Sequence, residues 1–502
     1  MMVKDARGVE ITALLSSLGA REIIGRPEGV VREVVGDSRR VSPGSLFVAL
    51  PGLHVDGHDF LEEARGRGAL AALVERPVRH VHSLPQIVVT ETRIALGVAA
   101  DYVYGRPSRA IPVLAVTGTN GKTTVIHLVE SIFQAAGKKC GLLGTLGYRW
   151  PGGQMNGTHT TPPADLLHRA LADMVRSGVD GACMEVSSHA VALGRVAGLK
   201  LAALALTNVT RDHIDFHETE ERYREEKRRL FFPDRAEKLA VVVEKAVLNG
   251  EDPVGAELAS RSPLERITYG FSGEFDLHAL VVNETIDGSR LRLLWCGEET
   301  EALLPLAGRY NAANALAAAG LSLLSGFSLS EVAAGLSAAK SPPGRLERVE
   351  CGQPFAVIVD YAHTPDGLKR LLETLRPVTG GRLILVFGCG GERDRGKRPI
   401  MGELAGELCD LVVLTDDNPR TEDPARVRAD VEEGLHRTGG EHAVVPDRRE
   451  ALAHALAAAR TGDTVVLAGK GHEQVQIIGE EKLFWDERSV AEEILREMGY
   501  GR

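Results

Sequence analysis

Residues Leu114–Thr124 read Leu-Ala-Val-Thr-Gly-Thr-Asn-Gly-Lys-Thr-Thr, an apolar run that breaks into a glycine-rich loop. Gly118 and Gly121 allow a tight turn in which successive N–H groups point at one anion. Lys122 adds a positive charge for the β- and γ-phosphates of a nucleotide, and the Thr123 hydroxyl suits Mg²⁺. The segment therefore predicts a strand, a phosphate-binding loop, and a helix whose positive end faces the phosphates.

The loop departs from the general phosphate-loop pattern at one position, because Val116 stands where the full pattern has glycine. Gly-Lys-Thr also occurs in loops by chance, but the apolar strand before it and the helical pattern after it favour phosphate binding. The candidate nucleotide-binding residues of this segment are Gly118, Thr119, Asn120, Gly121, Lys122, Thr123 and Thr124.

The bulk composition favours a cytoplasmic enzyme of several domains. A chain of 502 residues corresponds to about three domains of ordinary size. The net charge of −10, without a long basic run, argues against a nucleic-acid partner. The sequence has neither the ~18 uninterrupted apolar residues of a membrane span nor the pattern of a signal peptide. We therefore expect no membrane span and a cytoplasmic location.

Three segments with different patterns follow one another along the chain. Residues 1–109 mix short strands with one or two helices, whereas strands and helices alternate through residues 110–340. After Ser341-Pro-Pro-Gly344 the alternation restarts and continues through residues 341–502. Such alternation is typical of mostly parallel sheets covered by helices. We expect an α/β protein with a small α/β N-terminal domain, a central P-loop-type domain and a C-terminal Rossmann-like, doubly wound domain.

Apolar runs and helical periodicity locate the individual elements of these domains. The expected strands are 30–36, 45–49, 69–74, 113–116, 182–186, 202–206, 356–359, 383–387, 411–414 and 464–467. The expected helices are 57–67, 125–136, 164–177, 366–375, 399–408, 425–435 and 449–458.

Polar and glycine residues gather where these strands end. In an open parallel sheet, ligands bind at the carboxyl ends of the strands. The polar strand ends are 117–124, 185–189 and 207–217 in the middle segment, and 360–366, 388–398, 415–420 and 469–473 in the last. We therefore predict two facing ligand sites, one on each sheet.

Three residues are candidates for metal chemistry. Glu185 follows an apolar strand and can hold Mg²⁺ beside the Thr123 hydroxyl, although a solvated carboxylate is an alternative. His213 lies in a loop and can serve a second metal, but a surface histidine without a role fits its position equally well. Lys227 lies in the highly charged segment Tyr223–Leu230, whose composition predicts a solvated lysine.

The combination of motifs resembles the Mur ligases, the ATP-dependent amide-bond-forming enzymes of peptidoglycan precursor synthesis. The shared motifs are the phosphate loop, Glu185-Val-Ser-Ser-His189, Asp212-His-Ile-Asp215, Asn311-Ala-Ala-Asn314 and Asp360-Tyr-Ala-His-Thr-Pro365. The resemblance extends from Asp37-Ser-Arg39 to Gly469-Lys-Gly-His-Glu473. It implies a monomeric enzyme in which residues 1–109 bind a UDP-sugar, residues 110–340 bind ATP and residues 341–502 bind the incoming amino acid.

Within this family, the motif Asp417-Asn-Pro-Arg420 accompanies the addition of meso-2,6-diaminopimelate, whereas lysine-adding relatives lack the arginine. Arg420 can pair bidentately with a carboxylate, and diaminopimelate carries a second carboxylate that lysine does not. The resemblance therefore implies that this amino acid is added to UDP-N-acetylmuramoyl-L-alanyl-D-glutamate through an acyl-phosphate, with ATP as co-substrate. A lysine-adding ligase, a folylpolyglutamate synthetase and a nucleotide-binding regulator are the alternatives.

The resemblance also implies roles for individual residues. Lys122, Glu185, His213 and Lys227 match catalytic positions, and Lys227 matches a lysine that carries a carbamate (N6-carboxylysine). Two Mg²⁺ ions are implied, with Thr123, Glu185, His213 and modified Lys227 as their ligands. The positions that match the UDP-muramoyl-dipeptide site are Gly36, Ser38, Leu53, His54, Val55, Thr160, Thr161, Ser187 and Arg195. Asn314, Arg345, Asp360 and Tyr361 match further ATP contacts. The positions that match the diaminopimelate site are Arg393, Asp417, Asn418, Pro419, Arg420, Gly469 and Glu473.

Overall fold

A computed structural model describes residues 8–52, 55–155, 157 and 159–501 of the chain. In it the chain forms two compact units. The first unit comprises Met1–Leu277 and Ala317–Val332, and the second comprises His278–Leu316 and Ala333–Arg502. Among the described residues, no helix is both long enough and apolar enough to cross a membrane. Leu53 and His54, two positions of the predicted dipeptide site, lie outside the described residues.

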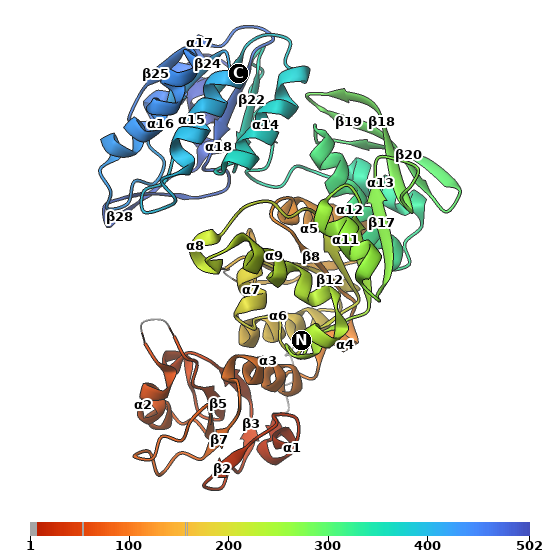
Figure 1. Cartoon of the computed structure of the whole chain (residues 1–502), viewed down its shortest axis with the longest axis vertical. Coiled ribbons are helices and arrows are strands. Elements are labelled where there is room, and N and C mark those ends of the chain that lie inside the picture. The colour runs from red at the N-terminus through yellow and green to blue at the C-terminus, as the bar shows by residue number, and fades with distance from the viewer. Residues whose placement is uncertain (1–7, 53–54, 156, 158, 502) are drawn as a thin grey trace. The chain divides into compact units, whose positions relative to one another are not determined.

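The N-terminal part of the first unit is a small α/β sandwich. In sheet order its strands are β2 (Glu22–Ile24), β7 (Gln86–Val88), β6 (Ala71–Val74), β5 (Ser45–Val48) and β4 (Glu33–Val35), of which the last four are parallel. One face packs on α3 (Thr92–Val103) and the other on α2 (Leu61–Gly66), because alternate strand residues point to opposite faces (Figure 1). The short elements around it are β1 (Val9–Glu10), α1 (Ile11–Leu15), β3 (Val30–Val31), η1 (Ser38–Arg40), η2 (Gly57–Phe60) and α4 (Pro107–Ala110).

A larger, mostly parallel sheet fills the rest of the first unit. Its strands in order are β11 (Gly153–Met155), β10 (Gly147–Trp150), β9 (Cys140–Gly144), β12 (Gly181–Glu185), β8 (Val113–Thr117), β14 (Ala203–Leu206), β16 (Lys245–Asn249) and β17 (Glu265–Gly270). Strand β10 pairs antiparallel with both β9 and β11, and the pairings from β9 to β17 are parallel, so the predicted mostly parallel arrangement is confirmed. The other elements are α5 (Lys122–Ala135), α6 (Ala164–Arg176), α7 (Ser188–Ala192), α8 (Ile214–His217), α9 (Glu220–Arg228), η3 (Arg229–Phe231), α10 (Pro233–Glu237), α11 (Pro253–Arg261), β13 (Lys200–Leu201) and β15 (Val242–Val243).

The register of this sheet positions the first group of candidate site residues. Glu185 at the end of β12 pairs with Val116 of β8, and Leu206 at the end of β14 pairs with Thr117. The three strands are parallel and end at the same level, so the segments that follow them meet at one sheet edge. That edge carries the glycine-rich loop.

The C-terminal sheet of the second unit is covered on both faces. Its strands in order are β21 (Glu347–Arg348), β22 (Ala356–Asp360), β26 (Thr464–Ala468), β23 (Leu383–Phe387), β24 (Leu411–Leu414) and β25 (His442–Val444), all parallel except β21. One face packs on α14 (Pro365–Val378), α15 (Lys397–Leu408) and α16 (Pro424–Thr438), which lie side by side in Figure 1. The other face packs on α17 (Arg448–Ala458) and α18 (Glu487–Glu497). This is the predicted doubly wound arrangement.

The second unit also contains antiparallel strands that the sequence analysis did not predict. They are β18 (Leu277–Thr285), β19 (Gly288–Trp295), β20 (Glu298–Leu304), and the hairpin of β27 (Val475–Ile478) and β28 (Glu481–Phe484). Helices α12 (Arg309–Leu324) and α13 (Leu329–Ala338) each contribute residues to both units. Side chains alternate between buried and exposed along most of β19, so no continuous apolar run marks it.

Candidate active site

The predicted glycine-rich loop joins β8 to α5 in the structure. Gly118 has a φ of +148° and Gly121 a φ of +90°, in the region that favours glycine. A Cβ at position 118 would also overlap the hydroxyl oxygen of Thr207, which follows β14. Position 118 therefore requires glycine for its backbone conformation and for its packing.

The ammonium group of Lys122 lies against this loop. Its Nζ donates hydrogen bonds to the carbonyl oxygens of Gly118 and Thr119, both at 2.8 Å. Lys122 is also the first residue of α5, and Thr123 and Thr124 are buried in the same helical turn. The positive end of a helix beside an ammonium group attracts anions. The loop thus has the charge that a phosphate group needs.

Residues after β14 and within α9 hold the loop in place. The N–H of Thr119 donates to the carbonyl oxygen of Asn208 (2.8 Å), and the N–H of Asn120 donates to the side-chain oxygen of Asn208 (3.1 Å). The hydroxyls of Thr119 and Tyr223 are 2.8 Å apart. Asn208 and Tyr223 had no predicted role. Asn208 carried a signal, because it directly follows a strand, but no local pattern distinguished Tyr223.

Glu185 is buried at the end of β12, with 1% of its surface exposed. Its carboxylate accepts hydrogen bonds from the Thr123 hydroxyl (3.0 Å) and from the N–H (2.9 Å) and hydroxyl (3.1 Å) of Thr145. The solvated-carboxylate alternative is therefore wrong. A carboxylate with adjacent hydroxyls supplies the oxygen ligands that Mg²⁺ prefers. Thr145 was not predicted, although it follows the end of β9.

Lys227 is buried in α9, with 2% of its surface exposed, so the prediction of a solvated lysine is wrong. Its Nζ donates a hydrogen bond to the carbonyl oxygen of Gly118 (2.7 Å). Burial lowers the pKa of Lys227 well below its usual value, and the nearby Lys122 ammonium lowers it further. A lowered pKa increases the share of the neutral, nucleophilic amine relative to that of a solvated lysine.

His213 lies at the start of α8, next to a cluster of aromatic side chains. Its ring meets the His189 ring edge-on, with 4.7 Å between the ring centres, and lies 6.3 Å from the ring of Tyr223. The Nζ of Lys227 lies 4.8 Å from the centre of the same Tyr223 ring. His213 and Lys227 therefore both lie near the Tyr223 ring.

The predicted dipeptide-binding residues of segment 110–340 form a network of hydrogen bonds around Glu185, mostly to main-chain groups. The Thr161 hydroxyl donates to the carbonyl oxygen of Glu185 (2.9 Å) and accepts from the N–H of Ser187 (3.1 Å). Arg195 donates to the carbonyl oxygen of Thr161 (3.1 Å), and burial lowers the pKa of its guanidinium. The hydroxyl of Thr160 lies 3.2 Å from that of Thr145 and accepts its hydrogen bond. These residues therefore share one polar cluster with Glu185.

Three further predicted dipeptide residues, Gly36, Ser38 and Val55, lie in the N-terminal sandwich. Gly36 follows β4, and Val55 is exposed. The Ser38 hydroxyl donates to the carboxylate of Glu63 (3.1 Å).

Three of the further ATP-contact candidates lie together in the second unit. The carboxylate of Asp360 accepts hydrogen bonds from the N–H groups of Leu346 and Ala362, both at 2.8 Å, and burial raises its pKa. The guanidinium carbon of Arg345 lies 4.8 Å from the centre of the Tyr361 ring. An arginine above an aromatic ring makes a flat platform of the kind on which a base stacks. Asn314, the fourth candidate, is held within α12 by its hydrogen bond to Asn311 (3.2 Å).

Three of the predicted diaminopimelate residues contact a buried lysine for which the sequence had predicted no role. Lys470 is fully buried after β26, and its Nζ lies 2.5 Å from the Asn418 side-chain oxygen and 3.1 Å from the Asp417 carboxylate. The Glu473 carboxylate accepts a hydrogen bond from the Asn418 amide nitrogen (2.9 Å). Gly469, with a φ of +103°, turns the chain into this cluster. Lys470 thus fixes the orientation of Asn418 and Asp417.

Arg420 and Arg393 lie close to the same glycine. A Cβ built on Gly390 would be 3.1 Å from a terminal nitrogen of Arg420 and 3.7 Å from Cγ of Arg393. Arg420 donates to the carbonyl oxygens of Gly391 (2.6 Å) and Asn418 (3.4 Å), while Pro419 packs its carbonyl oxygen against Gly391. Carbonyl oxygens leave the positive charge of Arg420 uncompensated, so the group can pair with an anion.

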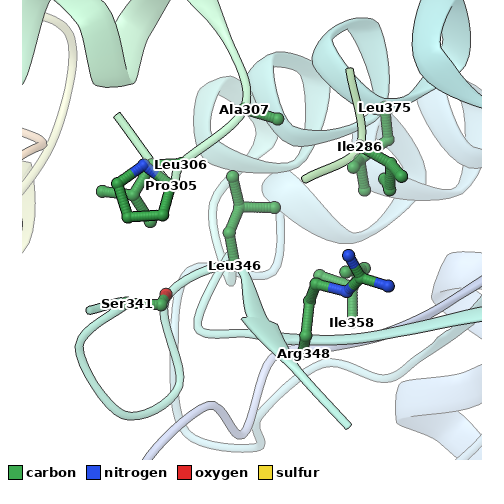
Figure 2. A pocket seen from close by; sticks show the side chains of 9 residues that line it. All are labelled: Ile286, Pro305, Leu306, Ala307, Ser341, Leu346, Arg348, Ile358 and Leu375. Carbon is green, nitrogen blue, oxygen red and sulfur yellow. The ribbon is translucent and has the colours of Figure 1, made fainter. Parts of the chain in front are cut away.

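A separate, mostly apolar cavity of about 120 Å³ lies elsewhere in the second unit. Figure 2 shows its lining: Ile286, Pro305, Leu306, Ala307, Ser341, Leu346, Arg348, Ile358 and Leu375. Its one charged group, Arg348, forms ion pairs with Asp287 and Glu350. None of the predicted site residues lines this cavity, so we do not assign a substrate to it.

Three family models match the chain over most of its length. Residues 30–114 match the model described as Mur ligase family, catalytic domain, and residues 116–322 match that of the Mur ligase middle domain. Residues 344–471 match the model described as Mur ligase, glutamate ligase domain.

Curated relatives and solved structures resemble nearly the whole chain. The UDP-N-acetylmuramoyl-L-alanyl-D-glutamate–2,6-diaminopimelate ligase of Geobacillus kaustophilus is 42% identical over 481 residues, which are 95% of this chain and 96% of that protein. The ligase of the same name from Gloeobacter violaceus is 45% identical over 91% of this chain and 92% of its own length. A solved structure of a ligase of this name has a TM-score of 0.71 at 30% identity and covers 98% of this chain and 99% of its own. MurF of Acinetobacter baumannii, at 19% identity and a TM-score of 0.66 over 93% of this chain and 96% of its own, shares the fold.

Proposed function

The chain belongs to the Mur ligase family, and on this premise we propose that it joins meso-2,6-diaminopimelate to UDP-N-acetylmuramoyl-L-alanyl-D-glutamate at the expense of ATP. The observation that carries the choice of amino acid is the position of Arg420. Its guanidinium and the Arg393 side chain both lie within 4 Å of a Cβ built on Gly390, and it donates to the main chain of Asn418, whose side-chain amide donates to Glu473. Such a site suits an amino acid with two carboxylates and two ammonium groups, because each charge meets its opposite. Lysine lacks the second carboxylate.

The reaction proceeds through an acyl-phosphate. The terminal carboxylate of the D-glutamyl residue attacks the γ-phosphorus of ATP, and ADP leaves. The neutral amine of diaminopimelate then attacks the acyl carbon, and the tetrahedral intermediate expels phosphate. Lys122 and the loop N–H groups neutralise charge on the transferring phosphoryl group, so positioning and electrostatics supply most of the rate enhancement.

We propose that Thr123 and Glu185 hold one Mg²⁺ ion, because they supply a hydroxyl and a buried carboxylate 3.0 Å apart. We assign a second Mg²⁺ to His213 and to a carbamate on Lys227. The neutral amine of Lys227 can add to CO₂ with loss of one proton, which converts a nitrogen base into an oxygen ligand. Bound Mg²⁺ supplies additional positive charge for the phosphate groups.

The remaining residues divide among the substrates. We assign Gly36, Ser38, Leu53, His54, Val55, Thr160, Thr161, Ser187 and Arg195 to the UDP-muramoyl-dipeptide. We assign the loop 118–124 with Asn314, Arg345, Asp360 and Tyr361 to ATP. We assign residues 417–420 with Arg393, Gly469 and Glu473 to diaminopimelate. Residues 1–109, 110–340 and 341–502 are the corresponding functional segments, and the need for ATP supports a cytoplasmic location.

Phosphate release by the purified full chain tests this proposal. ATP, MgCl₂, the UDP-muramoyl-dipeptide and meso-diaminopimelate are supplied together, and each is omitted in turn. We expect sustained phosphate release only in the complete mixture, with a product whose mass is that of the dipeptide plus diaminopimelate minus water. Sustained release without either acceptor or amino acid would instead indicate a nucleotide hydrolase. Release with a folate substrate in place of the UDP-sugar would indicate a folylpolyglutamate synthetase.

A further inference from the structure

Two histidines and one glutamate form a cluster on the second unit that the ligase reaction does not use. They are Glu432 and His436 of α16 and His442 at the start of β25. One ligand atom from each residue lies within 4.8 Å of the others. The Nε2 atoms of His442 and His436 are 3.6 Å and 4.0 Å from Oε1 of Glu432.

Local backbone structure brings these three side chains together. Glu432 and His436 are four residues apart in α16, so they share one face of the helix. Gly439, with a φ of +68°, ends the helix in the left-handed conformation and turns the chain back through Gly440 into β25. His442 therefore returns to the side of the helix that carries the other two residues.

The hydrogen bonding of His442 favours metal ligation by Nε2. Its Nδ1 lies 3.1 Å from the carbonyl oxygen of Gly440, which requires the proton to be on Nδ1. The lone pair of Nε2 then points toward the carboxylate of Glu432. A second-sphere carbonyl that fixes the histidine tautomer in this way is a regular feature of metal sites.

The charges around the cluster leave it available to a cation. The guanidinium of Arg437, the neighbouring basic group on α16, pairs with Glu433 (2.6 Å) and Glu403 (3.6 Å). The side chain of His442 is 18% exposed, that of Glu432 33% and that of His436 66%, so an ion can enter from solvent. The two imidazole rings stand 5.3 Å apart at 69°, and therefore present separate nitrogens rather than stacked faces.

We propose that Glu432, His436 and His442 bind one divalent transition-metal ion of the Zn²⁺ class. Two imidazole nitrogens and one carboxylate oxygen suit Zn²⁺ rather than Mg²⁺, which prefers oxygen ligands. Tetrahedral ligand atoms at the usual Zn²⁺ distances are about 3.3 Å apart. Small side-chain rotations can bring the ligand atoms of the three residues from their observed separations to this distance. Water takes the fourth position. The ion clamps the end of α16 to β25 across the Gly439–Gly440 turn and stabilises the second unit.

Zinc titration of the full, chelator-treated chain tests the proposal. The phosphate-loop region can take up Zn²⁺ as well, so the readout is the difference between variants. We expect His442→Ala and His436→Ala each to lose one equivalent of bound Zn²⁺, or to weaken it at least about tenfold. The matched control is His454→Ala, an exposed histidine of α17 in the same unit, which should retain the wild-type stoichiometry.

Cobalt absorption and thermal unfolding give two independent readouts. Co²⁺ should produce the visible bands of a tetrahedral site in the wild type and in His454→Ala, and these bands should be lost in His442→Ala. Zn²⁺ should raise the unfolding temperature of the wild type more than that of His442→Ala, whereas Mg²⁺ should produce no such difference. Because His436 is the most exposed ligand, His436→Ala serves if His442→Ala fails to fold. Equal Zn²⁺ stoichiometry and affinity in wild type and folded His436→Ala would overturn the proposal, whether or not the chain is active as a ligase.

Discussion

At the scale of single residues, Lys122 is the most direct test of the phosphate loop. Its half-buried side chain ends in an ammonium that donates to two loop carbonyls, and it is not part of the apolar core. We expect Lys122→Ala to lower kcat by at least about 10²-fold, the size of effect seen when one charge-stabilising group is removed. The free energy of unfolding should change little.

Lys139→Ala is the matched control for this prediction, because Lys139 is an exposed lysine just beyond the same helix. It should retain wild-type kcat. Steady-state phosphate release and urea unfolding measure both quantities. Wild-type turnover in folded Lys122→Ala would remove the assignment of the loop to phosphate.

Lys227 tests the carbamate. Its buried position and lowered pKa favour the neutral amine, which is the form that reacts with CO₂. We expect Lys227→Ala to lose ligation almost completely, and short carboxylates such as acetate to restore part of it. Native mass spectrometry in bicarbonate should show one added CO₂ on the wild type and none on Lys227→Ala. Exposed Lys238→Ala is the control and should keep both the modification and the activity. A fully active, unmodified wild type would contradict the assignment.

Sequence reasoning found the residues whose type alone indicates their chemistry. Glycines and a lysine in a loop after an apolar strand predicted the loop correctly, because few other residues tolerate that backbone. Lys227 was misjudged because α9 is charged on most of its faces, and composition does not tell which face is buried. Lys470 was missed for a similar reason. Its burial depends on Asp417 and Asn418, which are far away in the sequence.

At the scale of elements, the buried parallel strands were predicted best. Strands 383–387 and 411–414 were predicted with the observed bounds, because both faces are covered and every residue is apolar. The antiparallel strands β18–β20 were missed. Charged residues such as Arg290 and Glu301 interrupt the apolar pattern of β19 and β20, whereas β18 exposes apolar residues such as Val282. The predicted start of α5 was three residues too late, because Lys122, Thr123 and Thr124 give its first turn a polar, loop-like composition.

The strand-to-helix turn at Gly118 offers a test of the loop conformation. Alanine at position 118 would have to adopt a positive φ, and its Cβ would overlap the Thr207 hydroxyl. Gly118→Ala should therefore lower the free energy of unfolding by about 1–3 kcal/mol. The matched control is Gly66→Ala in α2, where no atom lies within 4 Å of the added Cβ. This control should raise stability by roughly 0.5–1 kcal/mol, as expected in a helix. An unfolding curve of Gly118→Ala that overlays the wild type would contradict the loop geometry.

Helices α3 and α6 carry a buried Asp101–His168 pair, with 3.7 Å between carboxylate and imidazole. Burial raises the pKa of Asp101 to about 6 and lowers that of His168 to about 4. Between pH 4 and 6.5 the unfolded chain binds the His168 proton more tightly than the folded chain does. The contribution of His168 to the free energy of unfolding therefore decreases as pH falls. Between pH 3.8 and 6 the folded chain binds the Asp101 proton more tightly than the unfolded chain does. The contribution of Asp101 to the free energy of unfolding therefore decreases as pH rises.

The contributions of Asp101 and His168 to the free energy of unfolding have opposite pH dependences between pH 4 and 6. We therefore expect that a substitution of one residue reveals the pH dependence of the other. Asp101→Asn should lose stability on acidification from pH 6 to 4 more steeply than the wild type, by up to about 1.4 kcal/mol per pH unit. His168→Gln should instead lose stability as pH rises through the same range. Urea unfolding at several pH values measures both slopes. Parallel pH profiles for the two variants and the wild type would show that the pair does not titrate in this way.

At the scale of the whole molecule, the residues that we assign to phosphate and metal belong to the first unit. The residues that we assign to the incoming amino acid belong to the second. The choice of amino acid therefore depends on side chains of the second unit, above all Arg420. A lysine substrate has only a hydrogen where diaminopimelate has its second carboxylate, so Arg420 would lose a charge-assisted pair worth about 1.5–3 kcal/mol.

The ratio of kcat/KM for meso-diaminopimelate and L-lysine measures this choice most directly. We predict that the unmutated chain prefers meso-diaminopimelate by roughly 10–150-fold, the equivalent of that pair. Arg420→Ala should lose most of the preference, whereas Arg426→Ala, which removes an exposed arginine of α16, should keep it. Comparable kcat/KM values for the two amino acids in the unmutated chain would contradict the account and assign the chain to lysine addition.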